Sequence, residues 1–212
     1  MEDYELKRIL KETITEFHEV GIPKLYKRDI NIPKFRRINK VVTIVGPRRA
    51  GKTYLLYQIM KEMIEGGKDI RDMLYINFEN ERVSDIKKEQ LHLIIDSYEE
   101  LYSNKKPVVF LDEIQNVSGW EKFVRRLQEK GYKVYVTGSN SKLLSREIAT
   151  SLRGRAFSVE VFPLSFKEFL LFNNVHLKDN WEYSRMKNRV KALFDEYMTL
   201  SGFPEILSLI HI

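Results

Sequence analysis

The chain has 212 residues, of which 31% are charged, with a formal net charge of +6 and no cysteine. Without cysteine it can form neither a disulfide framework nor a thiolate zinc site. No apolar run is long enough to span a bilayer, and the acidic start lacks the charged-then-apolar layout of a signal peptide. We therefore expect a cytoplasmic protein without membrane insertion, whose basic balance permits a phosphate or nucleic-acid partner.

Residues 1–40 predict a helical N-terminal arm followed by a basic linker. Apolar residues recur at helical spacing from Leu6 to Phe17, and Gly21 with Pro23 ends the run. Residues 24–40 are irregular and rich in lysine and arginine. Two interpretations of this stretch stay open: a solvated charged face, or a segment that contacts a nucleotide base or a nucleic acid.

A phosphate-binding loop follows the linker. Val41 to Val45 is a β-branched run typical of a buried parallel strand, and Tyr54 to Glu65 carries the apolar stripe of a helix. The complete G-x-x-x-x-G-K-[ST] pattern stands between them. Strand, glycine loop and helix together turn backbone N–H groups and a helix N-terminus toward a polyphosphate. The loop consists of Gly46, Pro47, Arg48, Arg49, Ala50, Gly51, Lys52 and Thr53.

The loop residues have different expected roles. Gly46 and Gly51 allow conformations that bring the backbone close to the phosphates. We expect Lys52 to reach the β- and γ-phosphates of the nucleotide, and the Thr53 hydroxyl to bind Mg²⁺. The two arginines raise the local positive potential, with contact to a partner as the alternative. The predicted nucleotide-binding set also includes Pro47, Arg48, Arg49, Ala50 and Tyr54.

From residue 41 the chain alternates predicted strands and helices, which is the pattern of a parallel α/β sheet. We assign residues 41–162 to this core and residues 163–212 to a helical C-terminal appendage, which Ser165 and Glu168 open with a capping box. Its long second helix ends near Gly202. Further strands are expected at 73–78, 108–111, 133–137 and 156–161, and helices at about 86–102, from Trp120 to Leu127 and after an N-cap at Ser141.

An acidic pair, Asp112 and Glu113, ends the apolar run at 108–111. Parallel α/β sheets place their ligands at the carboxyl ends of strands, so we expect both side chains near the loop. Asp112 suits the Mg²⁺ shell, since this cation takes oxygen ligands and keeps several waters. Glu113 can polarise or deprotonate an attacking water, which favours a hydrolase over a phosphotransferase. The alternative is an exposed acidic turn.

Two further sets are candidates for the reaction. The fourth predicted strand continues into polar residues, of which Asn140 is the first choice to orient water against the γ-phosphate, with Ser139 or Thr137 as the second. A helix cap and turn is the alternative. Arg153 and Arg155 could neutralise charge in the transition state, in cis or from a neighbouring subunit, against the alternative of two solvated arginines.

In this order the motifs resemble the AAA-type branch of P-loop ATPases, and more narrowly the prokaryotic, often archaeal, ATPases of poorly known role. The resemblance covers residues 41 to about 206. Besides the loop, the phrases that carry it are Leu111-Asp112-Glu113-Ile114-Gln115 followed by Trp120, Thr137-Gly138-Ser139-Asn140-Ser141 with Leu143-Leu144, Leu152-Arg153-Gly154-Arg155, Leu164-Ser165-Phe166-Lys167-Glu168-Phe169 and Gly202-Phe203-Pro204-Glu205.

The resemblance implies a three-layer core with five parallel strands in the order 5-1-4-3-2, and ATP with Mg²⁺ as the ligand. It implies that Lys52, Thr53, Asp112 and Glu113 act as argued above, and that Arg153 or Arg155 matters to the nucleotide response. Relatives usually continue into a winged-helix or nuclease-like C-terminal region, whereas this chain stops at Ile212. The resemblance therefore implies a fragment or a shortened member, and the DNA-linked associations of the family are not carried over.

Three functional hypotheses follow. The first is Mg²⁺-dependent ATP hydrolysis. The second is a nucleotide-dependent regulatory switch with little turnover, and the third is a nucleic-acid-binding module coupled to ATP, which rests on the net charge of +6 and the basic stretch. A homo-oligomer and a DNA or protein partner are the partner classes that stay open.

Overall fold

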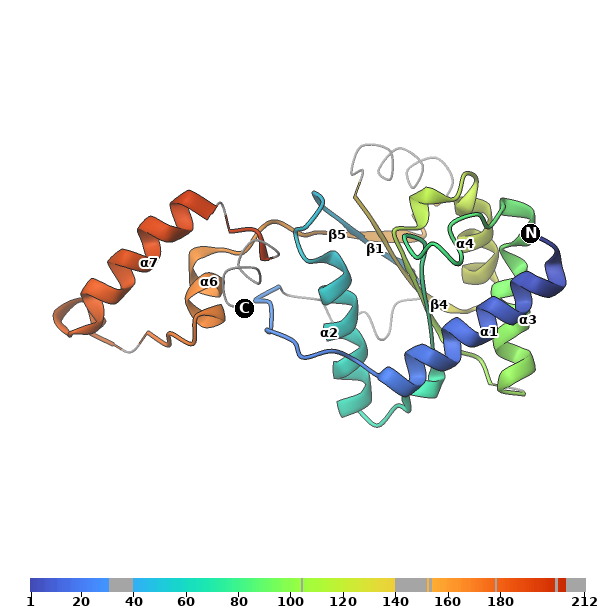
Figure 1. Cartoon of the computed structure of the whole chain (residues 1–212), viewed down its shortest axis with the longest axis horizontal. Coiled ribbons are helices and arrows are strands. Elements are labelled where there is room, and N and C mark those ends of the chain that lie inside the picture. The colour runs from blue at the N-terminus through green and yellow to red at the C-terminus, as the bar shows by residue number, and fades with distance from the viewer. Residues whose placement is uncertain are drawn as a thin grey trace.

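The computed structural model describes residues 1–30, 40–103, 105–139, 152, 154–177, 179–200 and 202–204. A five-stranded parallel sheet forms its centre (Figure 1). The strand order is β2-β3-β4-β1-β5, which confirms the order that the family resemblance implied. The strands are β1 (Val41–Val45), β2 (Met73–Asn77), β3 (Val108–Asp112), β4 (Lys133–Gly138) and β5 (Ala156–Glu160), each within one residue of its predicted ends.

The register brings the carboxyl ends of the strands to one edge of the sheet. Val45, the last residue of β1, is opposite Gly138 of β4 and Glu160 of β5. Asp112, the last residue of β3, is opposite Asn77 of β2. Because all the strands are parallel, the segments that follow β1, β3 and β4 leave the sheet at the same edge.

Helices cover both faces of the sheet, as the predicted three-layer core requires. In β1, Val42 and Ile44 pack with helix α2 on one face, while Val41 and Val45 pack on the opposite face. This alternation follows from the two-residue period of a strand. The helices are α2 (Lys52–Glu65) on the first face and α1 (Asp3–Val20), α3 (His92–Leu101) and α4 (Trp120–Glu129) on the other.

The N-terminal helix α1 is packed into the core. Leu6, Leu10 and Ile14 are buried in the same apolar cluster as α3 and α4. His18, near the C-terminal end of α1, forms hydrogen bonds of 2.8 Å with the Tyr102 hydroxyl and with the Met73 carbonyl oxygen. The predicted arm therefore packs against the core that begins at residue 41.

Short 3₁₀ turns account for the main differences in helix bounds. The helix expected at about 86–102 is α3, which starts only at His92, because the turn η3 (Lys88–Gln90) precedes it. Other such turns are η2 (Ile70–Asp72), η4 (Ile114–Asn116) and η5 (Trp181–Tyr183). The helix predicted after Ser141 lies outside the described residues.

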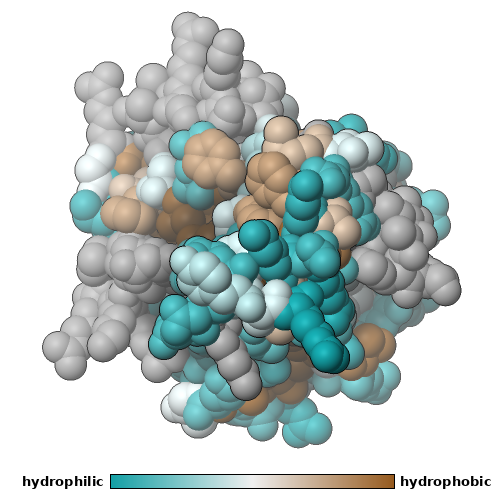
Figure 2. Space-filling model, turned by 90° about the vertical axis from the view of Figure 1, so that its left-hand side faces the viewer, coloured by the Kyte–Doolittle hydropathy of each residue, from teal (hydrophilic) through white to brown (hydrophobic). Residues whose placement is uncertain are grey.

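Beyond β5 the chain forms a helical unit, α6 (Phe166–Phe172) and α7 (Met186–Leu200), which extends from one side of the core (Figure 1). The predicted capping box is present: Ser165 and Glu168 exchange side-chain and backbone hydrogen bonds at the start of α6. Small apolar clusters around Phe169 and Leu170 join the two helices. Figure 2 faces this unit and shows hydrophobic residues exposed among hydrophilic ones.

Candidate nucleotide-binding site

The glycines of the loop are required by its packing. A Cβ atom at Gly46 would lie 2.1 Å from the carbonyl oxygen of Val161, so no side chain fits there. Gly51 has a left-handed φ of 91° and immediately precedes α2, which begins at Lys52. Because the first N–H groups of a helix have no intrahelical partner, this end of α2 is suited to bind an anion.

Lys52 lies inside the loop with its ammonium group fully engaged. Its Nζ donates to the Ser139 hydroxyl at 2.8 Å and to the Pro47 carbonyl oxygen at 3.1 Å. It also forms an ion pair of 3.1 Å with Glu113 Oε1, and only 3% of its side chain is exposed. The predicted phosphate-binding cation therefore contacts residues that follow β3 and β4.

Asp112 is completely buried at the end of β3. Its Oδ1 accepts a hydrogen bond from the Thr137 hydroxyl, and its Oδ2 accepts one from the Tyr75 hydroxyl at 3.0 Å. Burial raises the pKa of this carboxyl, although hydrogen bonds from Thr137, Thr53 and Tyr75 oppose the shift. Tyr57 donates in turn to the Tyr75 hydroxyl at 3.2 Å, so a buried chain of hydroxyls supports this carboxyl.

Glu113 has a left-handed φ of 52°, which turns its side chain toward Lys52. Its carboxylate accepts hydrogen bonds from Gln115 Nε2 at 2.6 Å and from the Ser139 hydroxyl at 2.8 Å. Burial alone would raise the pKa of Glu113, but the hydrogen bonds from Gln115 and Ser139 and the charge of Lys52 outweigh it, so this pKa is lowered. At neutral pH the group is therefore a carboxylate and able to accept a proton.

Polar residues at the end of β4 and just after it contact the acidic pair in two ways. The hydroxyl of Thr137 bridges the Asp112 side chain and the Glu113 backbone N–H, the latter at 2.8 Å. Ser139 links the Glu113 carboxylate to Lys52. These two residues are the second candidates for the water-orienting role. Asn140, the first choice, lies outside the described residues, so its role stays a prediction.

The site offers oxygen ligands that fit Mg²⁺. The Thr53 hydroxyl hydrogen-bonds to the Asp112 carboxylate, so the two predicted metal ligands lie together. Two protein oxygens suit a cation that keeps several waters and takes its other ligands from phosphate. Among the described residues, no three His, Cys, Asp or Glu side chains are grouped to hold a metal ion.

The other predicted nucleotide-binding residues differ in exposure and conformation. Arg48 is mostly exposed and pairs with Glu79 at 3.1 Å, while Ala50 is buried. Arg49 has a left-handed φ of 66°. The Tyr54 ring is half exposed and packs edge-on against Tyr57.

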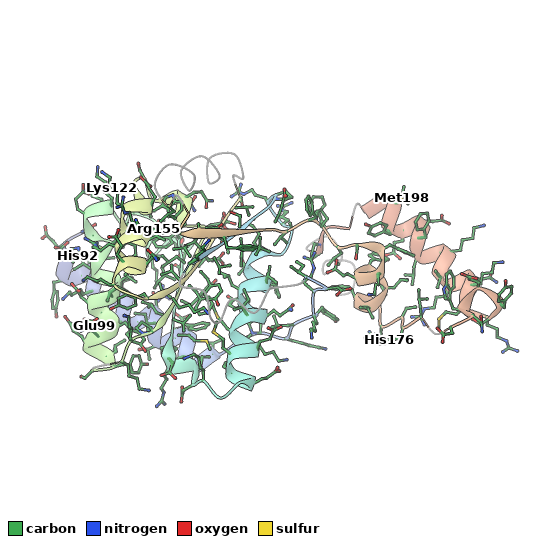
Figure 3. The ribbon with its side chains drawn as sticks, turned by 180° about the vertical axis from the view of Figure 1, so that it is seen from behind. His92, Glu99, Lys122, Arg155, His176 and Met198 are labelled. Atoms are coloured by element: carbon green, nitrogen blue, oxygen red, sulfur yellow. The ribbon has the colours of Figure 1, made fainter. Side chains whose placement is uncertain are left out.

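Arg155 lies at the wrong edge of the sheet to act in cis. It immediately precedes β5, and its carbonyl oxygen accepts the N–H of Val41, the first residue of β1. The loop follows the opposite end of β1. The Arg155 side chain pairs there with Glu129 at 3.0 Å, and Figure 3 shows it at the start of the β5 arrow, far from His176 and Met198 in the C-terminal unit. Arg153 lies outside the described residues; for both arginines, a role across a subunit boundary stays a prediction.

Sequence reasoning missed two residues that the structure joins to the site. Tyr75 contacts Asp112 from β2. Arg28, which belongs to the basic stretch, is buried and donates to the carbonyl oxygen of Ala50 in the loop. The available signal for Tyr75 was its place two residues before the end of a strand; nothing in the sequence distinguishes Arg28 from the basic residues around it.

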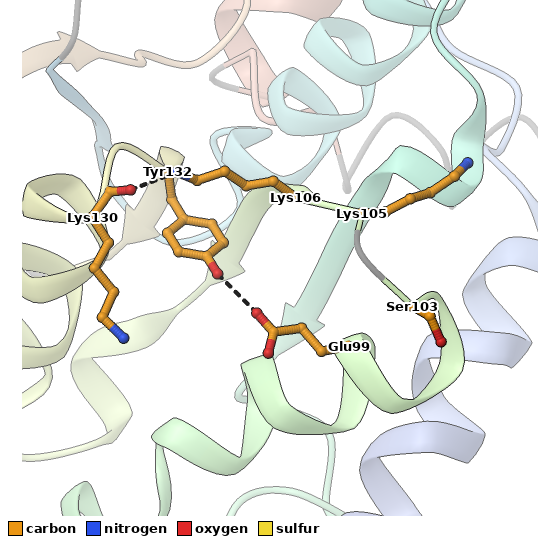
Figure 4. Close-up of a pocket in the computed structure, with 6 residues that line it drawn as sticks. All are labelled: Glu99, Ser103, Lys105, Lys106, Lys130 and Tyr132. Atoms are coloured by element: carbon orange, nitrogen blue, oxygen red, sulfur yellow. Dashed lines mark hydrogen bonds between the residues drawn. The ribbon is translucent and has the colours of Figure 1, made fainter.

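A hollow with a volume of about 700 Å³ lies at the opposite edge of the sheet from the loop (Figure 4). In it the Tyr132 hydroxyl donates to Glu99 at 3.1 Å, and Lys106 Nζ lies 4.7 Å from the centre of the Tyr132 ring. Its lining residues precede β3 and β4 or belong to the end of α3, so it is separate from the loop. They are Glu99, Ser103, Lys105, Lys106, Lys130 and Tyr132.

Comparison with known proteins gives relatives whose roles are not described. An uncharacterized protein of Methanocaldococcus jannaschii, MJ1544, is 42% identical over 201 residues, which cover 94% of this chain and 43% of that protein. An uncharacterized protein of Haemophilus influenzae is 37% identical over 177 residues, covering 82% of this chain and 42% of that protein. The chain thus spans less than half the length of these relatives.

A solved structure, C. elegans PCH-2, matches with a TM-score of 0.43 and 16% identity over 84% of this chain and 49% of that one. Within the described residues, no helix has the length and apolar character needed to cross a bilayer. The model of one family, described as AAA domain, matches residues 38–170. The chain therefore belongs to the AAA domain family, and it is a nucleotide-binding P-loop domain.

Proposed function

We propose that this domain binds ATP with Mg²⁺ and hydrolyses the bond to the γ-phosphate. The observation that carries the proposal is the contact of Lys52 with Glu113, beside the buried Asp112. A cation suited to phosphate, a metal carboxylate and an ionised general base meet at the edge of the sheet where the loop begins. This is the set of groups that phosphoryl transfer to water requires.

In the proposed reaction, Lys52 leaves Glu113 and binds the β- and γ-phosphates. Thr53 and Asp112 would hold Mg²⁺, which supplies charge neutralisation at the phosphate oxygens. The freed Glu113 orients a water whose oxygen bonds to the γ-phosphorus, while the bond from that phosphorus to the β–γ bridging oxygen breaks. ADP keeps the electron pair of that bond, and Glu113 takes a proton from the water.

Phosphate release by the wild-type chain and by Glu113→Gln tests this proposal. We expect the wild type to release phosphate in proportion to bound ATP. The variant should still bind ATP but release phosphate about 10²–10⁴-fold more slowly, the usual contribution of a general base. Equal, ATP-independent background rates in both proteins would refute it.

A regulatory switch with little turnover is the second candidate, and two observations favour it. Glu113 is held by Lys52, Ser139 and Gln115 before any water can be activated. Arg155 pairs with Glu129 at the far edge of the sheet, so an arginine at the γ-phosphate would have to come from elsewhere. Turnover measured over a range of protein concentrations separates the candidates. Tight ATP binding with negligible hydrolysis at every concentration would support the switch, whereas fast turnover by monomer would exclude it.

A further inference from the structure

Arg28 is a buried cation behind the phosphate loop, with 8% of its side chain exposed. Its N–H groups donate to three separate segments. Nε donates to Glu168 Oε1 at 2.8 Å, Nη1 to the Ala50 carbonyl oxygen at 2.9 Å, and Nη2 to the Phe162 carbonyl oxygen at 2.9 Å. A guanidinium suits this position because it offers a planar fork of donors and keeps its charge when buried.

The contact with Ala50 orients one peptide of the loop. In a planar trans peptide, the carbonyl oxygen and the following N–H point in opposite directions. Since Arg28 holds the Ala50 carbonyl, the N–H of Gly51 is turned away from Arg28. Backbone N–H groups of such loops are the donors for phosphate oxygens. A Cβ at Gly51 would lie 3.2 Å from Arg28 Nη1, so the guanidinium is packed directly against this peptide.

On its other side Arg28 contacts Glu168, whose side chain is held by hydrogen bonds at the start of α6. Its Oε1 accepts from Arg28 and from the Asp29 N–H at 2.9 Å. Its Oε2 accepts from the N–H and the hydroxyl of Ser165 at 2.9 and 3.0 Å. Because the bonds with Ser165 hold Glu168 at the start of α6, a displacement of the first turn of α6 also displaces Glu168 and changes its ion pair with Arg28.

The last residues of the described chain also approach the loop. The Gly202 carbonyl oxygen accepts the N–H of Leu164 at 2.8 Å, which returns the end of the helical unit to the start of α6. A Cβ at Gly51 would lie 3.7 Å from Pro204 Cγ. The loop therefore packs against Arg28 on the one hand and against the segment that follows α7 on the other.

We propose that Arg28 is a positioning residue of the phosphate loop, and that its ion pair with Glu168 couples nucleotide binding to the placement of the α6–α7 unit. The inference rests on the proposed nucleotide site. Arg28 acts through the Ala50–Gly51 peptide, while the loop backbone and Lys52 contact the phosphates. Coupling free energies are reciprocal, so a change at Glu168 must alter nucleotide affinity although Glu168 lies outside the site.

The first experiment titrates the full chain with a fluorescent ATP analogue in the presence of Mg²⁺. Glu168→Gln keeps the shape of the side chain but removes the charge that faces Arg28. We expect its nucleotide affinity to fall by about 5- to 150-fold, the usual range for coupled sites. Lys167→Gln is the matched control, because Lys167 is the neighbour of Glu168 on α6. The substitution breaks the exposed ion pair of 2.8 Å between Lys167 and Asp29. This variant should bind nucleotide as the wild type does.

The double variant Arg28→Met with Glu168→Met separates positioning from folding. Replacing both partners leaves no uncompensated buried charge. The backbone groups that Arg28 and Glu168 bond nevertheless lose their partners, so we expect a folded protein with a lowered melting temperature. We expect reduced nucleotide affinity, because the Ala50 carbonyl has lost its donor. Wild-type affinity in the folded double variant would overturn the inference and leave the proposed function intact. If the double variant does not fold, Glu168→Gln decides, with its melting curve showing that it is folded during the titration.

Amide hydrogen exchange in α7 tests the coupling itself. In the wild type and in Lys167→Gln, saturating nucleotide should change the protection of α7, and this change should be lost in Glu168→Gln. Unchanged protection of α7 in the nucleotide-bound wild type would overturn the coupling. Failure of the wild type to bind nucleotide would overturn both this inference and the proposed function.

Discussion

The hydroxyl of Thr137 accepts the backbone N–H of Glu113 at 2.8 Å and donates its own proton to the Asp112 carboxylate. One side chain on β4 therefore contacts both Asp112, the proposed metal ligand that ends β3, and Glu113, the proposed general base that follows it. Both hydrogen bonds join groups of β4 to the end of β3, so the sheet itself positions the acidic pair. This relationship makes Thr137 testable apart from the phosphate contacts.

Thr137→Val should preserve nucleotide binding but slow hydrolysis. The variant keeps the volume of the side chain and loses both hydrogen bonds, so the Glu113 backbone and the Asp112 carboxylate are no longer fixed relative to each other. We expect phosphate release to fall by about 10- to 100-fold, as for other residues that orient ligands, and the free energy of unfolding to drop by about 1–3 kcal/mol. Stopped-time phosphate assays and denaturant unfolding measure the two effects.

Thr43→Val is the control for Thr137→Val. The Thr43 hydroxyl is also buried on a central strand, where it shares a hydrogen bond of 2.8 Å with Ser158. Its loss should lower stability without a specific effect on hydrolysis. The same reduction of turnover in both variants would contradict a special role for Thr137.

Tyr75→Phe should weaken Mg²⁺ binding more than nucleotide binding. The variant removes the hydroxyl that donates to Asp112 Oδ2 at 3.0 Å and leaves the ring in place. Residues that orient a metal ligand are typically worth 10- to 100-fold in metal affinity, so the Mg²⁺ concentration for half-maximal hydrolysis should rise by about that factor.

Tyr57→Phe removes the hydroxyl that donates to Tyr75 and does not itself bond Asp112, so it should have a smaller effect on the Mg²⁺ requirement. Nucleotide affinity measured with excess EDTA should be equal in the wild type and both variants. An unchanged Mg²⁺ requirement in Tyr75→Phe would show that Tyr75 serves packing alone.

The sequence pattern predicted the parallel sheet and the edge at which the site forms, whereas the strand order came from the family resemblance. The loop after Val45 and the acidic pair at Asp112 mark the ends of two parallel strands, and parallel strands end at one edge. The same reasoning explains the outcome for Arg155. It precedes a strand parallel to β1, and residues that precede such a strand lie at the edge of the sheet opposite the loop.

Arg28 and Tyr75 could not be assigned from the sequence because their roles depend on distant partners. Glu168 is 140 residues away from Arg28, and in the sequence Arg28 is one basic residue of an irregular stretch. Tyr75 reaches Asp112 across 37 residues, through a pairing of β2 with β3 that a single strand pattern does not specify. Local motifs predict the residues of the loop, whereas the groups that orient them come from tertiary packing.

Gly46→Ala should abolish nucleotide binding. The new Cβ would lie 2.1 Å from the Val161 carbonyl oxygen, and a clash with backbone cannot be relieved by a rotamer change, so the start of the loop must move. Overpacking of this kind typically costs about 1–3 kcal/mol of stability. Thermal unfolding and the ATP-analogue titration measure both consequences.

Gly67→Ala is the matched control for Gly46→Ala. A Cβ at Gly67 meets nothing within 4 Å, although its φ is +94°. It should therefore cost about 1–2 kcal/mol of backbone strain and leave nucleotide affinity unchanged. Wild-type nucleotide binding by Gly46→Ala would refute the close packing of the loop against the segment after β5.

His18 should make the stability of the domain depend on pH. Burial lowers the pKa of this imidazole, and the charge of Arg71 adds to the effect, while the hydrogen bond to the Met73 carbonyl opposes it. The folded protein therefore binds the proton more weakly than the unfolded chain, whose histidine has a pKa of about 6.5. The stabilisation is complete above that pH and is lost as the pH falls toward the lowered folded-state pKa.

We expect the midpoint of denaturant unfolding to decrease between about pH 7 and pH 5 in the wild type, with a flatter profile in His18→Gln. That variant removes the titrating group and should be less stable than the wild type at pH 7, since the hydrogen bond between His18 and Tyr102, 2.8 Å long, is lost. His92→Gln, at an exposed position on α3, should retain the wild-type slope. Equal slopes in all three proteins would assign the acid sensitivity to groups other than His18.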